Sequence, residues 1–306
     1  MARKIIPRSL VSHLEWKPGL APATPQPPLP PKGNGQLIDI ERIVSEGSIE
    51  GNTFYDATKD STGNYIGLPI ALEQALAHAG ADGFVPNLIE FIAAKVLAPK
   101  THNFWKKWYS VHSEENIGID KNGKIYTKNT PVYVIVNGGG ILTPDRIKQA
   151  YTQGLVDHSA RYSDPEFDGL LDGRLPDGTK LELFKFEDIQ NGMTNRPHRF
   201  GIVVPYSIVQ GTKSGYHKRA EFLANPLVIA RGAGDIETLT KYFDLAKDGD
   251  GDVGNYHPFS GREATVPQGR LLFVDDDFYG LDGNSNLGNG GRFVGVGAPK
   301  APGAPK

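Results

Sequence analysis

Cysteine is absent from the 306 residues, which excludes disulfide bonds, zinc–thiolate sites and cysteine nucleophiles. Long apolar runs are absent too: no segment approaches the roughly 18 apolar residues of a membrane-spanning helix. The N-terminus lacks the apolar stretch of a secretory signal, so we expect a cytoplasmic protein by default, with extracellular release by another route left open. The formal net charge is only −2, which argues against nucleic acid as a partner.

Hydrophobic residues make up only 39% of the chain, whereas glycine (37) and proline (23) are abundant. Seven prolines lie within residues 18–31, a composition that favours stiff, extended polyproline II structure. We therefore expect an extended, basic, proline-rich arm at 1–35 and a second extended tail at 299–306. Three interpretations of these arms stay open: unstructured tails, arms that lace onto neighbouring copies, and proline-motif ligands for another domain.

Helices are predicted where apolar residues recur every three to four positions between capping residues. Thr143, Pro144 and Gly154 are typical start and stop residues, and Ser163 with Glu166 fits a capping box. The predicted helices are 68–80, 85–99, 141–155, 163–171 and 235–247. The predicted strands, rich in β-branched and aromatic residues, are 131–136, 199–209, 270–274 and 292–297, and 117–128 is predicted to form a hairpin around Asn122.

Helices gather before residue 160 and strands after it, although the two kinds mix. The sequence therefore predicts an α+β fold with a helix-rich N-terminal half and a strand-rich C-terminal half. We place a helix-rich lobe with a β-hairpin at 36–160 and a strand-rich lobe with acidic Asx-Gly loops at 161–298.

One motif occurs twice, as DGDGDVGN from Asp248 and as DGNSNLGN from Asp282. The spacing of Asp248, Asp250 and Asp252 is that of carboxylates that converge on a hard cation. An EF-hand would need Gly at the sixth position and Glu at the twelfth, but these positions hold Val253 and Phe259 in the first copy, and Leu and Phe in the second. The shared residues favour an Asx-Gly turn that buries its apolar positions.

A metal site stays open as the alternative for the first copy. His257 follows the acidic loop, so Asp248, Asp250, Asp252 and His257 are the candidate ligands. Carboxylate and imidazole groups together suit Ca²⁺ or another divalent metal. No motif requires a cofactor.

Two further segments could bind anions. The triple glycine at 138–140 lies between a strand and a capped helix, where backbone N–H groups can face an anion, but the sequence favours a tight turn, because it lacks the spacing of phosphate-binding loops. Residues 196–219 are predicted to form a basic hairpin that gathers positive side chains at one end, for an anion or an acidic partner. These residues are Arg196, His198, Arg199, Lys213, His217, Lys218 and Arg219.

Three functions follow from these features. The favoured one is a non-enzymatic structural subunit that assembles with itself, as a homo-oligomer, through its arms and charged patches. Because no serine-hydrolase or zinc-protease motif is present, the sequence favours a non-enzymatic role without deciding the point. The alternatives are a metal-dependent enzyme of hydrolase type with its site near Asp248–His257, and an anion- or ligand-binding module using the 196–219 hairpin.

Overall fold

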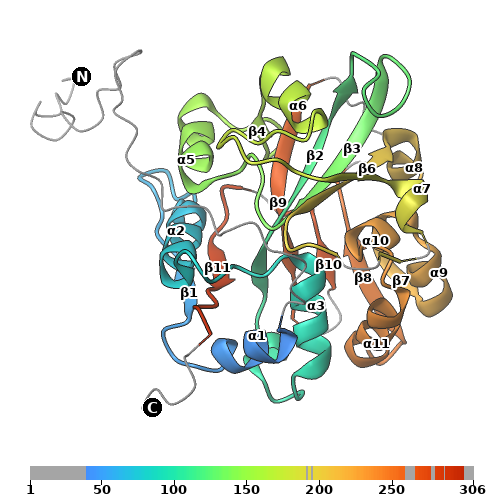
Figure 1. Cartoon of the computed structure of the whole chain (residues 1–306). Helices are drawn as coiled ribbons and strands as arrows, with labels where there is room; N and C mark the ends of the chain where they lie inside the picture. Colours follow the sequence, from blue (N-terminus) through green and yellow to red (C-terminus); the bar gives the residue numbers. More distant parts are fainter. Residues whose placement is uncertain are drawn as a thin grey trace, which may run out of the picture.

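The computed structural model describes residues 39–190, 192–193, 196–258, 266–276, 280–285 and 287–299. Helices cover both faces of a twisted central sheet (Figure 1). The helices are α1 (Ile40–Gly47), α2 (Gly67–Ala79), α3 (Leu88–Leu97), α4 (Asn103–Lys106), α5 (Pro144–Gln153), α6 (Asp164–Leu171), α7 (Phe186–Ile189), α8 (Tyr206–Gln210), α9 (Arg219–Ala224), α10 (Pro226–Arg231) and α11 (Ile236–Ala246). The strands are β1 (Thr53–Asp56), β2 (Tyr109–Asp120), β3 (Thr130–Asn137), β4 (Ala160–Arg161), β5 (Leu183–Lys185), β6 (Phe200–Pro205), β7 (Gly215–Lys218), β8 (Asp252–Tyr256), β9 (Gln268–Val274), β10 (Leu281–Asp282) and β11 (Gly291–Val294).

The large sheet has the order β5-β6-β3-β2-β9-β10-β8-β7, and β4 also pairs with β9. Most pairs are antiparallel, but β10 runs parallel to β8, and β5 runs parallel to β6. A separate two-stranded sheet joins β1 to β11. The predicted α+β fold is confirmed.

Side chains of the central strands alternate between two cores, because successive residues of a strand point to opposite faces. In β3, Val132, Val134 and Val136 join the core under α2, α5 and α6, whereas Tyr133 and Ile135 join the core under α1, α3 and α10. Burial on both faces explains why the sequence of this strand is an almost continuous apolar run.

Local capping signals in the sequence are confirmed. Thr143 accepts a hydrogen bond from the Arg146 N–H at the start of α5, and Gly154 ends that helix at φ 83°. The Ser163 capping box begins α6. The capping box of α3 at Asn87 was not predicted.

The predicted strand at 199–209 is wrong beyond Pro205, where β6 ends and α8 begins. Proline has no N–H to continue a strand ladder, and its fixed φ suits the start of a helix. The predicted hairpin at 117–128 is only partly right, because β2 and β3 form a hairpin that pairs as far as Asp120 and Thr130, so Asn122 and residues 125–128 lie in its loop.

The large sheet contains strands from both predicted lobes, and the lobe boundary itself remains a prediction. The arm at 1–35 lies outside the described residues, as does the tail apart from residue 299. Within the described ranges, no helix is long and apolar enough to cross a membrane.

Candidate functional site

A fully buried ion pair joins the end of α10 to the central strand β2. The Arg231 Nη2 lies 2.6 Å from the Glu115 Oε1, the Arg231 Nε donates to the same oxygen at 2.8 Å, and both side chains are 0% exposed. The Tyr133 hydroxyl also donates to this oxygen. Burial raises the pKa of Tyr133 well above its usual value, and the neighbouring carboxylate raises it further. Three donors converge on the Glu115 Oε1, which offsets part of the cost of burying the two charges.

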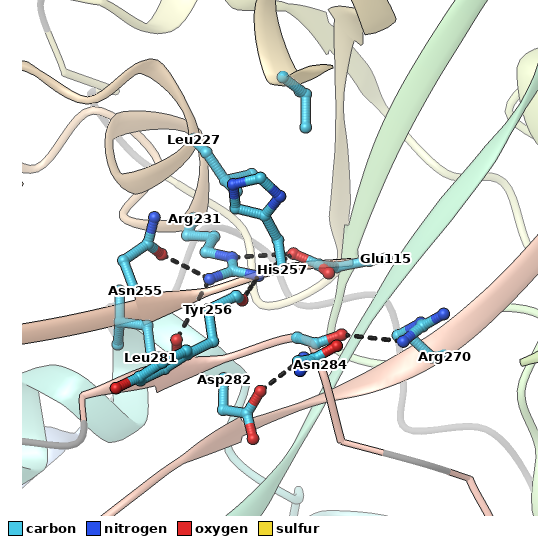
Figure 2. Close-up of polar contacts among 12 residues, drawn as sticks. Glu115, Leu227, Arg231, Asn255, Tyr256, His257, Arg270, Leu281, Asp282 and Asn284 are labelled. Atoms are coloured by element: carbon cyan, nitrogen blue, oxygen red, sulfur yellow. Dashed lines mark hydrogen bonds and ion pairs between the residues drawn. The ribbon is translucent and has the colours of Figure 1, made fainter. Parts of the chain in front are cut away.

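The remaining donors of Arg231 hold two neighbouring strands (Figure 2). Nη1 donates to the Asn255 Oδ1 at 2.5 Å and to the Leu281 carbonyl at 3.3 Å, and Nη2 donates to the Tyr256 carbonyl at 2.9 Å. One guanidinium group therefore ties α10 and β2 to β8 and β10. We call Arg231, Glu115, Tyr133 and Asn255 the buried network.

The turn after β10 lies directly against this network. A Cβ atom at Gly283 would overlap the Glu115 Oε2 and the Arg231 Nη2, so glycine is required for the close approach. The Glu115 Oε2 is buried and has no hydrogen-bond partner among the described residues. One unsatisfied carboxylate oxygen thus lies beneath the turn.

A second buried arginine, Arg270 of β9, connects this turn to another one. Its Nη1 donates to the Gly283 carbonyl at 3.3 Å, and its Nη2 donates to the Asp157 carbonyl at 2.8 Å. Asp157 (φ 48°) and His158 (φ 65°) are the central residues of a two-residue turn between Val156 and Ser159, and both have the left-handed backbone of a type I′ turn. The Leu287 N–H donates to the His158 carbonyl at 3.1 Å, so this turn is held from two sides.

Polar and aromatic side chains from these turns reach the protein surface. We define the turn surface as Tyr216, Tyr256, Asp282, Asn284 and Asp157. Tyr216 is 38% exposed, Asn284 and Asp157 are exposed, and the other two are half-buried. The Tyr216 and Tyr256 rings meet edge to face with their centroids 5.8 Å apart. Asp282 is the register partner of Tyr256, which brings the carboxylate beside this aromatic pair.

Acidic groups set the electrostatics of this region. Burial raises the pKa of Tyr256, and its hydrogen bond to Tyr216 and the negative Asp275 and Asp282 raise it further. Burial raises the pKa of Asp275 to about 7, helped by the charge of Asp282 and opposed by Lys95. Near neutral pH Asp275 is therefore only partly ionised, and the positive Arg231 lies 2.9 Å from the Tyr256 carbonyl, so charges of both signs surround Tyr256.

Two predicted metal ligands instead stabilise their own turn. The Asp248 Oδ1 accepts hydrogen bonds from the N–H groups of Asp250 and Asp252, each at 2.9 Å. The Asp252 carboxylate lies 2.9 Å from the Lys218 Nζ, which also donates to the Asp250 carbonyl at 2.6 Å. The first motif is thus an Asx turn in which Lys218 bridges the Asp252 carboxylate and the Asp250 carbonyl.

His257 faces the interior rather than this turn. The side chain is buried, with the residue 3% exposed, and its Nε2 lies 3.0 Å from the Thr212 Oγ1. The backbone N–H of His257 donates to the Ser214 Oγ at 3.0 Å. Burial lowers its pKa to about 4, and the positive Arg231 lowers it further. Across the described ranges, no group of three or more His, Asp or Glu side chains is placed to hold a metal ion.

The second copy of the motif uses the same turn. The Asp282 Oδ1 accepts from the N–H two residues on, at 2.5 Å. The repeated apolar position is buried in both copies, as Val253 and Leu287, and Phe293 is buried as well. Residue 259 lies outside the described part of the chain. What the copies share is a fold-back turn over buried apolar residues.

The predicted basic hairpin is wrong, because β6 pairs with β3 and β5, whereas β7 pairs with β8 at the far edge of the sheet. Arg196, His198 and Arg199 therefore lie apart from the other four residues. They pair with Asp235 at 3.9 Å, with Glu90 at 3.0 Å and with Asp177 at 3.5 Å, respectively.

The other four residues lie at or beside β7. Lys218 pairs with Asp252, and the Arg219 Nε lies 2.9 Å from Asp244. His217 is 3% exposed, and burial lowers its pKa. Lys213 lies in the loop between α8 and β7. The structure therefore does not gather the seven predicted residues into one patch.

The possible anion-binding position at the triple glycine, 138–140, is occupied by a side chain of the same protein. The two oxygens of the buried Glu114 accept from the N–H groups of Ile141 and Leu142, each at 2.8 Å, and a Cβ at Gly140 would overlap this carboxylate. A carboxylate of the protein thus occupies the anion-binding position.

Sequence reasoning missed the residues of the buried network. Glu114, Glu115 and Asn116 lie in the middle of β2, which is buried along almost its whole length. A polar run flanked by strand-forming residues was the available signal, since buried charges need partners.

No family model and no curated protein matches the chain. A solved structure entitled "Accommodation of massive sequence variation in Nanoarchaeota by the C-type lectin fold" is similar, with a TM-score of 0.57 and 25% sequence identity over 80% of this chain and 96% of that one. The α+β architecture thus has a neighbour with a C-type lectin fold.

Proposed function

We propose that this protein is a ligand-binding module, in which a C-type-lectin-like scaffold presents the turn surface to another molecule. The binding class agrees with one of the alternatives drawn from the sequence, but the surface lies at the ends of β8 and β10 instead of at a basic hairpin.

The turn at Asp157 and His158, held by Arg270, is the observation that carries the proposal. Hydrogen bonds from Arg270 and Leu287 enforce the position of this turn. Here the enforcing groups are buried, whereas Asp157, Asn284 and Tyr216 above them are exposed. This division between a rigid base and exposed polar turns is typical of binding sites built from loops.

The similar structure supports the same interpretation. Its title attributes to the C-type lectin fold the accommodation of massive sequence variation. Loops vary more in sequence than the elements they connect and carry binding residues more often, so a fold that accommodates variation suits a binding module. In this chain the buried network supplies such a base, because Arg231 bonds to the backbone of β8 and β10 as well as to side chains.

Self-assembly through the terminal arms remains a prediction, as does a divalent metal at Asp248–His257. The arms lie outside the described residues except for residue 299, and the acidic turn is explained by its own hydrogen bonds.

An array of purified peptides, proteins and glycans tests the proposal. The full chain should bind at least one class of ligand, and Tyr216→Ser should reduce that binding at least tenfold without lowering the Tm. Tyr55→Ser is the matched control, because Tyr55 is 46% exposed but lies on β1, across the molecule from β7 (Figure 1). Absence of binding, or equal losses in both variants, would contradict the proposal.

A further inference from the structure

We propose that the cavity between α5, β4 and the start of α6 binds a small organic carboxylate, held between the guanidinium groups of Arg146 and Arg161. The cavity has a volume of about 680 Å³, within the roughly 300–1,000 Å³ of small-molecule sites. It adjoins the turn surface at Val156 but takes its charged residues from other elements. The inference therefore goes beyond the proposed function and does not depend on it.

Arg146 of α5 is fixed at the wall of this cavity. Its Nε donates to the Glu166 Oε1 at 2.8 Å, and its Nη2 donates to the Arg161 carbonyl. The Tyr162 ring packs against the guanidinium group, with its centroid 5.5 Å from the Arg146 Cζ, and the Tyr162 hydroxyl donates to the Asn116 Oδ1 at 2.8 Å. The guanidinium group is thus positioned before any ligand binds, which reduces the entropic cost of binding.

One nitrogen of this guanidinium group lacks an acceptor. The Arg146 Nη1 is buried and has no hydrogen-bond partner among the described residues. A buried donor without an acceptor is costly, so an oxygen that a ligand brings to it is bound favourably. The Arg146 side chain lines the cavity and is 11% exposed, so a ligand in the cavity lies next to this group.

A second guanidinium group lines the same cavity without a counter-ion. Successive residues of a strand point to opposite faces, so Arg161 of β4 points away from the core that Ala160 enters. Arg161 is exposed, and across the described ranges it forms no ion pair. Lys121, the third cation of the cavity, is neutralised by Asp164 at 2.5 Å. An anion between the two arginines would supply the missing negative charge.

The charges of the wall favour a carboxylate over a phosphate dianion. Three cations and two carboxylates line the cavity, so their net charge of +1 matches a single negative charge; these residues are Lys121, Arg146, Arg161, Asp164 and Glu166. A planar guanidinium group also fits the two oxygens of a carboxylate. The amide side chains of Gln149 and Gln153 line the cavity too, and amides bond to hydroxyl groups. We therefore expect a carboxylate that carries hydroxyl groups.

A ligand-observed NMR titration of the full chain with gluconate and with sorbitol tests the inference. Sorbitol is the matched neutral probe, because it replaces the carboxylate of gluconate by a hydroxymethyl group. We expect gluconate to bind at least about fivefold more tightly than sorbitol and than inorganic phosphate. Arg161→Gln should weaken gluconate binding about fivefold, and so should Arg146→Lys, which keeps the charge but loses the planar donor group.

The control variant is Arg219→Gln, which makes the same change of charge on α9, across the molecule from α5 (Figure 1). Because its ion pair with Asp244 is exposed, its loss should change gluconate binding less than about twofold and leave the fold intact. Equal binding of gluconate and sorbitol, no binding of gluconate, tighter binding of phosphate, or equal losses in Arg219→Gln and Arg161→Gln would each overturn the inference. Tyr216→Ser should leave gluconate binding unchanged, so this inference and the proposed function can fail separately.

Discussion

Replacing Arg231 by methionine tests whether the buried network stabilises the fold. Methionine is close to arginine in length but removes the positive charge and every donor that reaches Glu115, Asn255, Tyr256 and Leu281. Removing one member of a buried ion pair costs about 3–5 kcal/mol, because the other charge stays buried without compensation. Folded domains typically have a free energy of unfolding of about 5–15 kcal/mol, so this single substitution would remove a large part of it.

Urea denaturation followed by far-UV circular dichroism measures this loss. The double variant Glu115→Gln with Arg231→Met provides the decisive comparison, because it removes the uncompensated carboxylate too. We expect the double variant to recover at least about 1 kcal/mol relative to Arg231→Met, as residues in one network couple by about 0.5–3 kcal/mol. If the double variant is as unstable as the sum of the two single variants, the pair is not coupled and the reasoning is refuted.

Three further predictions concern the turns. Gly283→Ala should lower the free energy of unfolding by about 1–3 kcal/mol, because its methyl group overlaps Glu115, and a smaller loss in chemical denaturation would contradict this close packing. Asp275 has a folded-state pKa of about 7, above its ordinary 3.8, so its stabilising contribution is present below pH 3.8 and is lost as the pH rises through 7. The Tm of Asp275→Asn minus the Tm of the native chain should therefore increase from pH 5 to pH 8. A difference that stays constant over this range would exclude the titration of Asp275. Asp248→Asn should keep the Tm, since an amide oxygen also accepts the turn's hydrogen bonds, whereas Asp248→Ala should cost about 1 kcal/mol; an equal loss in both, with a Tm that depends on added Ca²⁺, would favour the metal interpretation.

Local signals in the sequence predicted α2, α3, α5, α6 and α11, but not α1, α4 or α7 to α10. The start of α5 at Thr143 and its end at Gly154 depend on neighbouring residues alone, and the same holds for the Ser163 capping box. The Asx turns at Asp248 and Asp282 were predicted for the same reason, since each carboxylate bonds to N–H groups only a few positions ahead.

Strand pairing could not be predicted in this way. β6 and β7 are near neighbours in the chain, yet they lie at distant positions in the sheet, because β3 and β8 offer them partners from elsewhere. The candidate site depends on the same long-range contacts. Arg231 is the last residue of the short apolar helix α10, and Glu115 precedes it by more than a hundred residues, so their pairing leaves no local pattern.

The pairing of β1 with β11 constrains the order in which the sheets can form during synthesis. Thr53 pairs with Val294, so nearly the whole described chain is synthesised between the two strands. β2 likewise receives β9 as a neighbour only late in translation. Distant contacts of this kind slow folding, because a long loop must close before they form. During synthesis β2 can pair early with β3, but β1 and the other edge of β2 wait unpaired until the last segments emerge, and a chain truncated before β9 cannot complete either sheet.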